Sequence, residues 1–181
     1  NKFRQLYQEF STPNMYRTAS GAPGPAYYQQ QADYKMDIEL DDENKKIYGN
    51  ETMTYKNNSP YVLDYLWVQL DQNVRKKDSP SLEINGNGAS PYYLPSGFTK
   101  EFLSEPFDGG FNIEYVLDEN KKPLKYIVNQ TMMRIDLPTP LKSGESVSFS
   151  IKWWYNIQDH VNQDGRSGYE TFEKDGNRLY I

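Results

Sequence analysis

The side chains that most often carry catalysis and metal binding are scarce in this sequence. It contains one histidine, His160, and no cysteine, so a disulfide framework and thiolate chemistry are both excluded. A catalytic zinc ion normally has three protein ligands and an open position for water. The helical motif H-E-x-x-H supplies two of these ligands from one helix face, but His160 is followed by VNQD. We therefore expect no catalytic residue and no metal ligand in this chain.

The surroundings of His160 offer one weaker possibility. This histidine lies beside Asp159 in a stretch rich in turn-forming residues, where it could act as a lone acid or base. A surface or hydrogen-bonded structural histidine is the favoured interpretation. Ser167 is near in sequence, but its context, GRSGY, does not match the G-x-S-x-G nucleophile motif, and no strand-to-helix elbow is visible. We expect Ser167 to be unreactive.

Aromatic residues are the most unusual part of the composition, with 16 Tyr, 8 Phe and 3 Trp. Doublets occur at Tyr27-Tyr28, Tyr92-Tyr93 and Trp153-Trp154. Aromatic platforms can stack sugars or bind peptides, but in a β-rich domain they more often fill cores and interfaces. Core and interface roles are therefore favoured. The alternative is a free-standing secreted β-sandwich module that binds glycan or protein ligands.

Charge and length exclude several classes of protein. The formal net charge is −5 and the isoelectric point is about 5.0, whereas nucleic-acid binding needs a clustered surplus of Lys and Arg. No apolar run approaches the ~18 residues of a membrane span. The 181 residues are enough for one domain with its own core. We expect no nucleic-acid partner and no membrane span.

The elements that would position these residues are strands. In residues 33–40, Tyr34, Met36, Ile38 and Leu40 alternate with polar residues, which predicts a strand with one face on a core. In residues 63–73 both sets of alternating side chains are large, which suits a central strand buried on both faces. The other strands are predicted at residues 47–57, 81–84, 111–117, 124–129, 132–137 and 146–155.

Short strands without a long helix predict an all-β fold, an antiparallel β-sandwich. Residues 1–31 are expected to form an extended N-terminal arm packed on the domain, with a short helical stripe at residues 3–10, and residues 32–181 the sandwich. Residues 169–181 predict a hairpin around Asp175-Gly176. The chain begins at Asn1 and stops on an apolar triplet. We expect the polypeptide to continue beyond Ile181, since an unpaired edge invites aggregation.

Two acidic turns have similar sequences, LDDENKK at residues 40–46 and LDENKK at residues 117–122. Neither matches the D-x-[DN]-x-[DN]-G pattern of an EF-hand calcium loop. Asp and Asn are favoured in turns because their side chains bond to the nearby backbone. Both stretches are therefore predicted to be solvated turns.

Several stretches together carry a resemblance to a known family: YRTASGAPG at 16–24, QQQADY at 29–34, LDYLWVQLDQN at 63–73 and GRSGYE at 165–170. This set resembles the N-terminal domain of the aminopeptidase N-type zinc peptidases, the family that includes leukotriene hydrolase, and most closely its bacterial members. The resemblance covers most of the chain.

The resemblance implies a saddle-shaped β domain packed against a separate catalytic domain of the same polypeptide. That missing domain would hold the zinc ion, the general base and the G-x-M-E-N strand, and the intact enzyme would act on peptide substrates. In the family, a Gln or Glu just beyond the position of Ile181 grips the substrate amine, and no residue here takes that role. We expect a periplasmic or secreted location, with the cytoplasm as the alternative.

Overall fold

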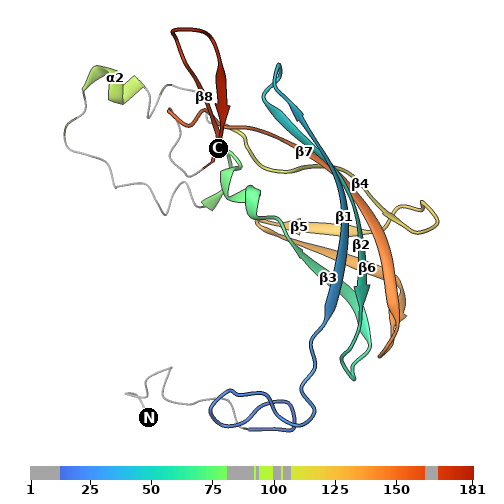
Figure 1. Ribbon diagram of the computed structural model, residues 1–181. Coiled ribbons are helices and arrows are strands. Elements are labelled where there is room, and N and C mark those ends of the chain that lie inside the picture. Colours follow the sequence, from blue (N-terminus) through green and yellow to red (C-terminus); the bar gives the residue numbers. More distant parts are fainter. Residues whose placement is uncertain (1–12, 81–91, 93, 100–102, 104–106, 162–166) are drawn as a thin grey trace.

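Two antiparallel sheets make up most of the structure (Figure 1). The computed structural model describes residues 13–161 and 167–181 apart from 81–91, 93, 100–102 and 104–106. The four-stranded sheet has the order β1-β2-β7-β4 and the three-stranded sheet the order β3-β6-β5. The strands are β1 (Gln31–Asp41), β2 (Lys46–Lys56), β3 (Leu63–Gln69), β4 (Asn112–Asp118), β5 (Tyr126–Asn129), β6 (Met132–Leu141) and β7 (Ser146–Asn156).

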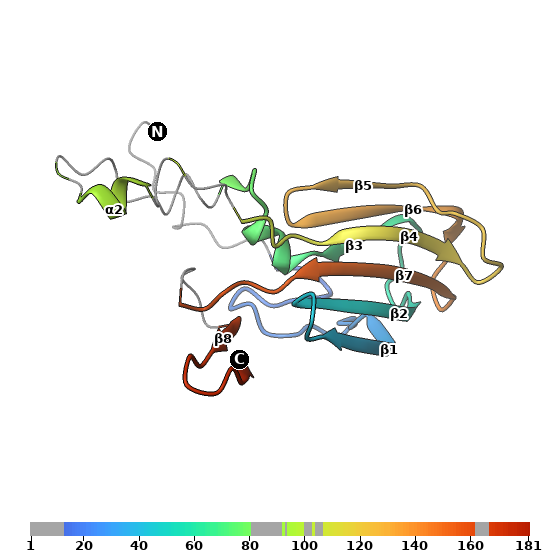
Figure 2. The same cartoon turned by 90° about the horizontal axis from the view of Figure 1, so that it is seen from above.

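The two sheets pack face to face as the layers of a sandwich (Figure 2). The four-stranded sheet contributes Met53, Phe149 and Ile151 to the core, and the other sheet contributes Met133 and Ile135. Phe149 and Ile151 are each 1% exposed and Met133 and Ile135 are fully buried. The predicted all-β antiparallel sandwich is confirmed.

Most predicted strands are present, but the predicted burial of residues 63–73 on both faces is wrong. β3 is the edge strand of its sheet and not a central strand. Leu66 faces the core, whereas Tyr65 and Trp67 on the other face are 41% and 53% exposed. The large aromatic side chains of this strand suggested burial, yet they lie on the outer surface of the sandwich.

Turn chemistry explains the two similar acidic stretches. The Asp41 carboxylate accepts a hydrogen bond from the Asn44 amide at 2.9 Å, and Asp118 accepts one from the Asn120 amide at 2.8 Å. Lys45 and Lys121 occupy matching left-handed positions with φ of 55° and 61°. Both stretches are turns, as predicted.

The remaining short elements lie at the ends of the sandwich. A 3-10 helix, η1 (Asp71–Arg75), follows β3, and α2 (Pro95–Phe98) is a single short helix. The predicted C-terminal hairpin is confirmed as β8 (Tyr169–Thr171) and β9 (Arg178–Tyr180), with Gly176 at φ 71° in its turn. Among the described residues there is no helix with the length and apolar character needed to cross a membrane.

Part of the N-terminal arm is described. Residues 13–30 do not run straight: isolated bridges pair Arg17 with Asn14 and with Pro23. The arm meets the sandwich where the Gln30 side chain donates to Asn57 Oδ1 at 3.2 Å. The predicted helical stripe at residues 3–10 and the predicted strand at residues 81–84 lie outside the described residues.

Candidate functional site

The apolar face of β1 is not covered by the second sheet. Tyr34, Met36, Ile38 and Leu40 point to the same side as the core residues of β2, because Tyr34 pairs with Met53 in the ladder. These four side chains are nevertheless 53%, 50%, 54% and 48% exposed. The expectation that this face lies on a core is wrong. The reason is the topology: β1 is the outermost of four strands, and only three strands lie opposite.

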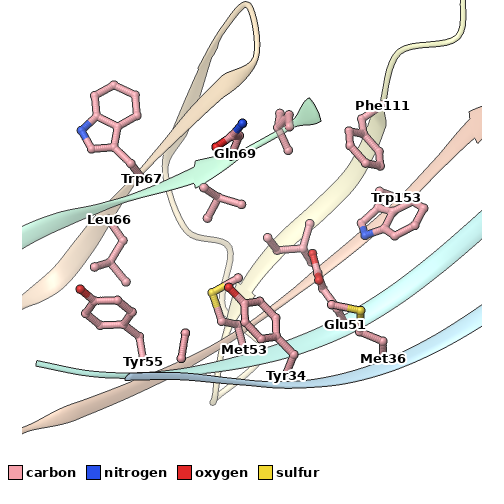
Figure 3. Close-up of a pocket in the computed structure, with 14 residues that line it drawn as sticks. Tyr34, Met36, Glu51, Met53, Tyr55, Leu66, Trp67, Gln69, Phe111 and Trp153 are labelled. Carbon is pink, nitrogen blue, oxygen red and sulfur yellow. The ribbon is translucent and has the colours of Figure 1, made fainter. Parts of the chain in front are cut away.

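A groove of about 490 Å³ opens between this uncovered face and β3 (Figure 3). We call it the β1–β3 groove. Its wall on the β1 and β2 side includes Tyr34, Met36, Met53 and Tyr55. The remaining lining residues are Ala32, Glu51, Leu66, Trp67, Val68, Gln69, Leu70, Phe111, Ile151 and Trp153.

Glu51 is the single carboxyl group among the residues that line this groove. It lies on β2 between Met36 of β1 and Ile151 of β7 in the ladder. Burial among these apolar neighbours raises the pKa of the Glu51 carboxyl, and a hydrogen bond from the Trp153 side chain partly opposes that rise. The groove thus carries one partly buried acid that binds protons more readily than a solvated glutamate.

Aromatic rings build the end of the groove around Trp153. The Trp153 ring stacks on Tyr155 at a centroid distance of 5.8 Å and an interplanar angle of 13°. Phe111 meets the same ring edge-on at 4.9 Å. Burial raises the pKa of the Tyr155 hydroxyl. The aromatic cluster is a rigid apolar support for the Glu51 carboxylate.

Sequence reasoning missed Glu51. The signal was available, because Glu51 has the same strand parity as Met53 and Tyr55 and must therefore share their face. Chemically, one carboxyl without a neighbouring base or nucleophile in the groove suits binding, whereas acid–base catalysis uses positioned partners. The arrangement can hold an apolar group together with one hydrogen-bond donor.

The outer face of the three-stranded sheet carries a second aromatic group. Tyr65 and Trp67 lie edge to face at 6.1 Å, and the Arg134 guanidinium lies 4.2 Å from the Tyr65 ring centroid. Asp136 holds Arg134 through a contact of 2.8 Å. This exposed cluster is the part of the described surface that best fits an aromatic platform.

Sequence reasoning considered Ser167 and His160 for catalysis, and the structure shows which groups each of them contacts. The Ser167 hydroxyl contacts the Arg75 guanidinium at 3.4 Å, and the Ser167 carbonyl accepts a hydrogen bond from Gln158. His160 Nδ1 is buried without a hydrogen-bond partner among the described residues. No hydrogen bond joins Ser167 and His160 in that part of the chain, so a serine nucleophile with a histidine base gains no support.

No group of three His, Cys, Asp or Glu side chains among the described residues is placed to hold a metal ion. The donor set described here therefore does not fit a zinc centre.

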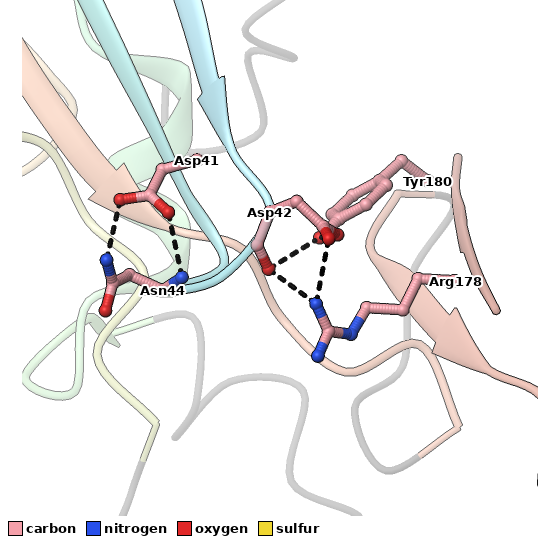
Figure 4. Close-up of polar contacts among 5 residues, drawn as sticks. All are labelled: Asp41, Asp42, Asn44, Arg178 and Tyr180. Carbon is pink, nitrogen blue, oxygen red and sulfur yellow. Dashed lines mark hydrogen bonds and ion pairs between the residues drawn. The ribbon is translucent and has the colours of Figure 1, made fainter. Parts of the chain in front are cut away.

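The C-terminal hairpin is tied to the turn after β1 through Asp42 (Figure 4). The Tyr180 hydroxyl donates to the Asp42 carboxylate at 2.6 Å, and Arg178 forms an ion pair with it at 3.0 Å. These two partners lower the pKa of Asp42. The cluster is a structural clamp that fixes the end of the described chain to the tip of the β1–β2 hairpin.

Comparisons with known proteins give a partial likeness. No protein-family model matches the chain, and no curated protein matches it. A mutant M1 zinc metallopeptidase from Deinococcus radiodurans is similar at 11% identity and a TM-score of 0.45, over 82% of this chain and 25% of that chain. A two-domain M1 zinc metallopeptidase mutant bound to L-tryptophan gives 11% identity and a TM-score of 0.44, over 86% of this chain and 29% of that chain.

The M1 zinc metallopeptidase from Deinococcus radiodurans without a stated mutation gives 12% identity and a TM-score of 0.42, over 80% of this chain and 27% of that chain. The chain therefore spans less than a third of the length of these enzymes. TM-scores below 0.5 do not establish a common fold.

Proposed function

We propose that this chain is a non-catalytic β domain of a zinc aminopeptidase that removes N-terminal residues from peptides. Its role is to shape and cover the active-site cleft of the intact enzyme. Motifs of the aminopeptidase N type support the assignment, most of all LDYLWVQLDQN at residues 63–73. The zinc ion and the catalytic residues belong to another domain of the same polypeptide.

The observation that carries this proposal is the uncovered apolar face of β1. Four large apolar side chains in a row, each about half exposed, make a surface of the kind that monomeric proteins seldom leave in water. The β1–β3 groove continues that surface into the sandwich. A neighbouring domain would bury it, which explains why a regular sandwich strand lacks cover.

The groove chemistry fits a supporting role. Hydrolysis by a zinc-activated water needs a metal with an open coordination position and a general base. The β1–β3 groove offers one carboxyl, Glu51, held by an indole N–H. In the intact enzyme, bound zinc would supply the activated water, while this domain limits access to the cleft.

Two measurements test the proposal. Sequencing the gene beyond the codon for Ile181 should reveal an H-E-x-x-H motif within a few hundred codons. The isolated chain should neither bind zinc at a defined stoichiometric site nor hydrolyse leucine p-nitroanilide, whereas the protein encoded by the whole gene should do both. A stop codon directly after Ile181, or chelator-sensitive turnover by the purified chain, would refute the assignment.

A second candidate function is supported by the exposed Tyr65–Trp67 pair on the outer face of β3. The centroids of the two rings are 6.1 Å apart. In this alternative the chain is a free-standing secreted module that binds glycans through ring stacking. Binding of an oligosaccharide that is lost in Trp67→Ala, with the fold intact by circular dichroism, would favour it. Retained binding in that variant would exclude it.

A further inference from the structure

The outer edge of β1 has the properties of an acceptor for another strand. β1 is eleven residues long, contains no Pro or Gly, and pairs with β2 in an unbroken register from Gln31 to Asp41. Among the described residues no strand or bridge pairs with its second edge. A long, regular edge strand of this kind is a template for strand addition.

The apolar face of β1 shows where the side chains of an added strand would go. Neighbouring strands lie about 4.8 Å apart and their opposite side chains touch. Alternate residues of a strand beside β1 would therefore pack against Met36 and Ile38, which are 50% and 54% exposed. They would also cover the mouth of the β1–β3 groove, of which Met36 is a lining residue.

The opposite face of β1 is acidic. It carries Asp33, Lys35, Asp37, Glu39 and Asp41, which are four acids and one base. Asp41 lies opposite Lys46 of β2, and the other four lie opposite the uncharged residues Thr54, Thr52, Asn50 and Tyr48. Within the described part of the chain, neither Asp37 nor Glu39 has an ion-pair partner, so their charges are available to an added strand.

This charge pattern selects the partner. Two copies of β1 paired edge to edge would bring acids of one copy against acids of the other, and like charges opposite each other are destabilising. A strand with basic residues on that face would instead be stabilised by attraction to these acids.

We propose that the free edge of β1 docks an extended segment of a partner polypeptide in which apolar and basic residues alternate. The apolar side chains cover Met36, Ile38 and the mouth of the groove, and the basic side chains face Asp37 and Glu39. The backbone of the partner segment completes the sheet. If the chain is part of a peptidase, this segment belongs to the neighbouring domain that buries the same face; the docking proposal itself does not require that assignment.

The test uses three nine-residue peptides and the whole 181-residue chain. The first peptide alternates Val with Lys, the second alternates Val with Glu, and the third has the composition of the first with all Val residues before all Lys residues. We expect only the first to bind in isothermal titration. In amide NMR spectra it should shift the resonances of β1 and leave those of β4, at the other edge of the sheet, in place.

Variants of exposed residues distinguish binding at this site from nonspecific electrostatic attraction. Asp37→Lys combined with Glu39→Lys should weaken binding of the Val–Lys peptide about tenfold or more and create binding of the Val–Glu peptide. Ile38→Lys should weaken binding of the Val–Lys peptide. The matched control is Glu119→Lys, in the turn after β4, which should leave binding of the Val–Lys peptide unchanged. The single change Glu39→Lys alters the net charge by the same amount and should weaken that binding.

Three results would overturn the proposal: no binding of the Val–Lys peptide at millimolar concentration, equal affinity for the Val–Glu peptide, or unchanged affinity after the double charge reversal. Sedimentation showing a wild-type dimer that Ile38→Lys dissociates would assign the edge to a second copy and also refute it. None of these results depends on the sequence beyond Ile181, so this proposal and the peptidase assignment fail separately.

Discussion

Trp153 lies directly over Gly49, its partner in the β2–β7 ladder. A β-carbon on Gly49 would come within 2.3 Å of the Trp153 ring, so the space of a side chain is filled by the indole itself. Because the ring lies there, its N–H reaches Glu51, two residues further along β2. The absence of a side chain at one strand position thus sets the position of the aromatic wall and of the acid beside it.

Gly49→Ala should displace the Trp153 ring and destabilise the fold. Overpacking of this kind costs about 1–3 kcal/mol, because a rigid ring on a paired strand cannot move aside without loss. Chemical denaturation followed by tryptophan fluorescence measures the change. The control is Gly97→Ala, where an added β-carbon meets nothing within 4 Å, and it should cause no loss. Equal stability of Gly49→Ala and wild type would show that the ring does not occupy this space.

Glu51→Gln should make the protein more stable than wild type at neutral pH. Burial is the main cause that raises the pKa of the Glu51 carboxyl above the ordinary value of about 4.5. The folded state therefore holds the proton more tightly than the unfolded state, and wild-type stability falls as pH rises from about 4.5 through the folded pKa. Glutamine keeps an acceptor for the Trp153 N–H and carries no charge.

The advantage of Glu51→Gln should accordingly disappear below pH 4.5, where both states of the wild type are protonated. Urea denaturation across the pH range measures it. Glu145→Gln is the control, because Glu145 is exposed and lies in the turn before β7. A stability difference between Glu51→Gln and wild type that does not depend on pH would contradict burial as the source of the effect.

Local pattern predicted the strands, and tertiary arrangement decided which faces are buried. The alternation in residues 33–40 identified β1 and the correct apolar face, since side-chain direction follows from a period of two. Whether that face is covered depends on how many strands lie opposite, which no local pattern contains. The same limit explains the error for β3, where Trp67 suggested burial and lies exposed at a sheet edge. Glu51 was missed for a different reason. A single acid in a strand is normally assigned to the solvent-facing side, and its burial is evident only when its neighbours on the adjacent strands are known.

Asp42→Asn should loosen the C-terminal hairpin from the sandwich. Asparagine removes the charge that Arg178 pairs with at 3.0 Å and weakens the bond from Tyr180. The amides of β8 and β9 should then exchange with deuterium faster, while those of β2 and β7 keep their rates. Glu43→Gln, in the same turn, is the control and should change neither. Unaltered exchange in the hairpin of Asp42→Asn would show that other contacts hold it.

The same clamp should respond to acid. The hydrogen bond from Tyr180, and then Arg178, lower the pKa of the Asp42 carboxyl below the ordinary value of about 3.8. Its contribution is therefore present above pH 3.8 and is lost as pH falls through the lower folded value. Amide exchange rates of the hairpin in wild type, corrected for intrinsic exchange, should stay constant down to about pH 3.8 and rise at lower pH. In Asp42→Asn this rise should be absent.

Asn57→Ala should be among the most damaging substitutions of a polar residue in this chain. Asn57 is fully buried, and its amide donates to the carbonyls of Tyr61 at 2.7 Å and Leu141 at 3.0 Å. Its side-chain oxygen accepts from Ser59 and from Gln30 of the N-terminal arm. Alanine removes this partner from the buried Leu141 carbonyl and the buried Ser59 hydroxyl, which costs about 1–3 kcal/mol for each group that water does not reach.

Loss of the Gln30 contact should also release the arm in Asn57→Ala. Limited proteolysis should then cut residues 13–30 faster than in wild type, and denaturation should report the lower stability. Asn58→Ala is the matched control, because the exposed Asn58 side chain contributes one hydrogen bond, to the Gln29 carbonyl at 2.9 Å. Asn58→Ala should lower the free energy of unfolding by much less than Asn57→Ala does. Equal effects of the two substitutions would mean that burial of Asn57 does not set the strength of this junction, and that the arm is held by its other contacts.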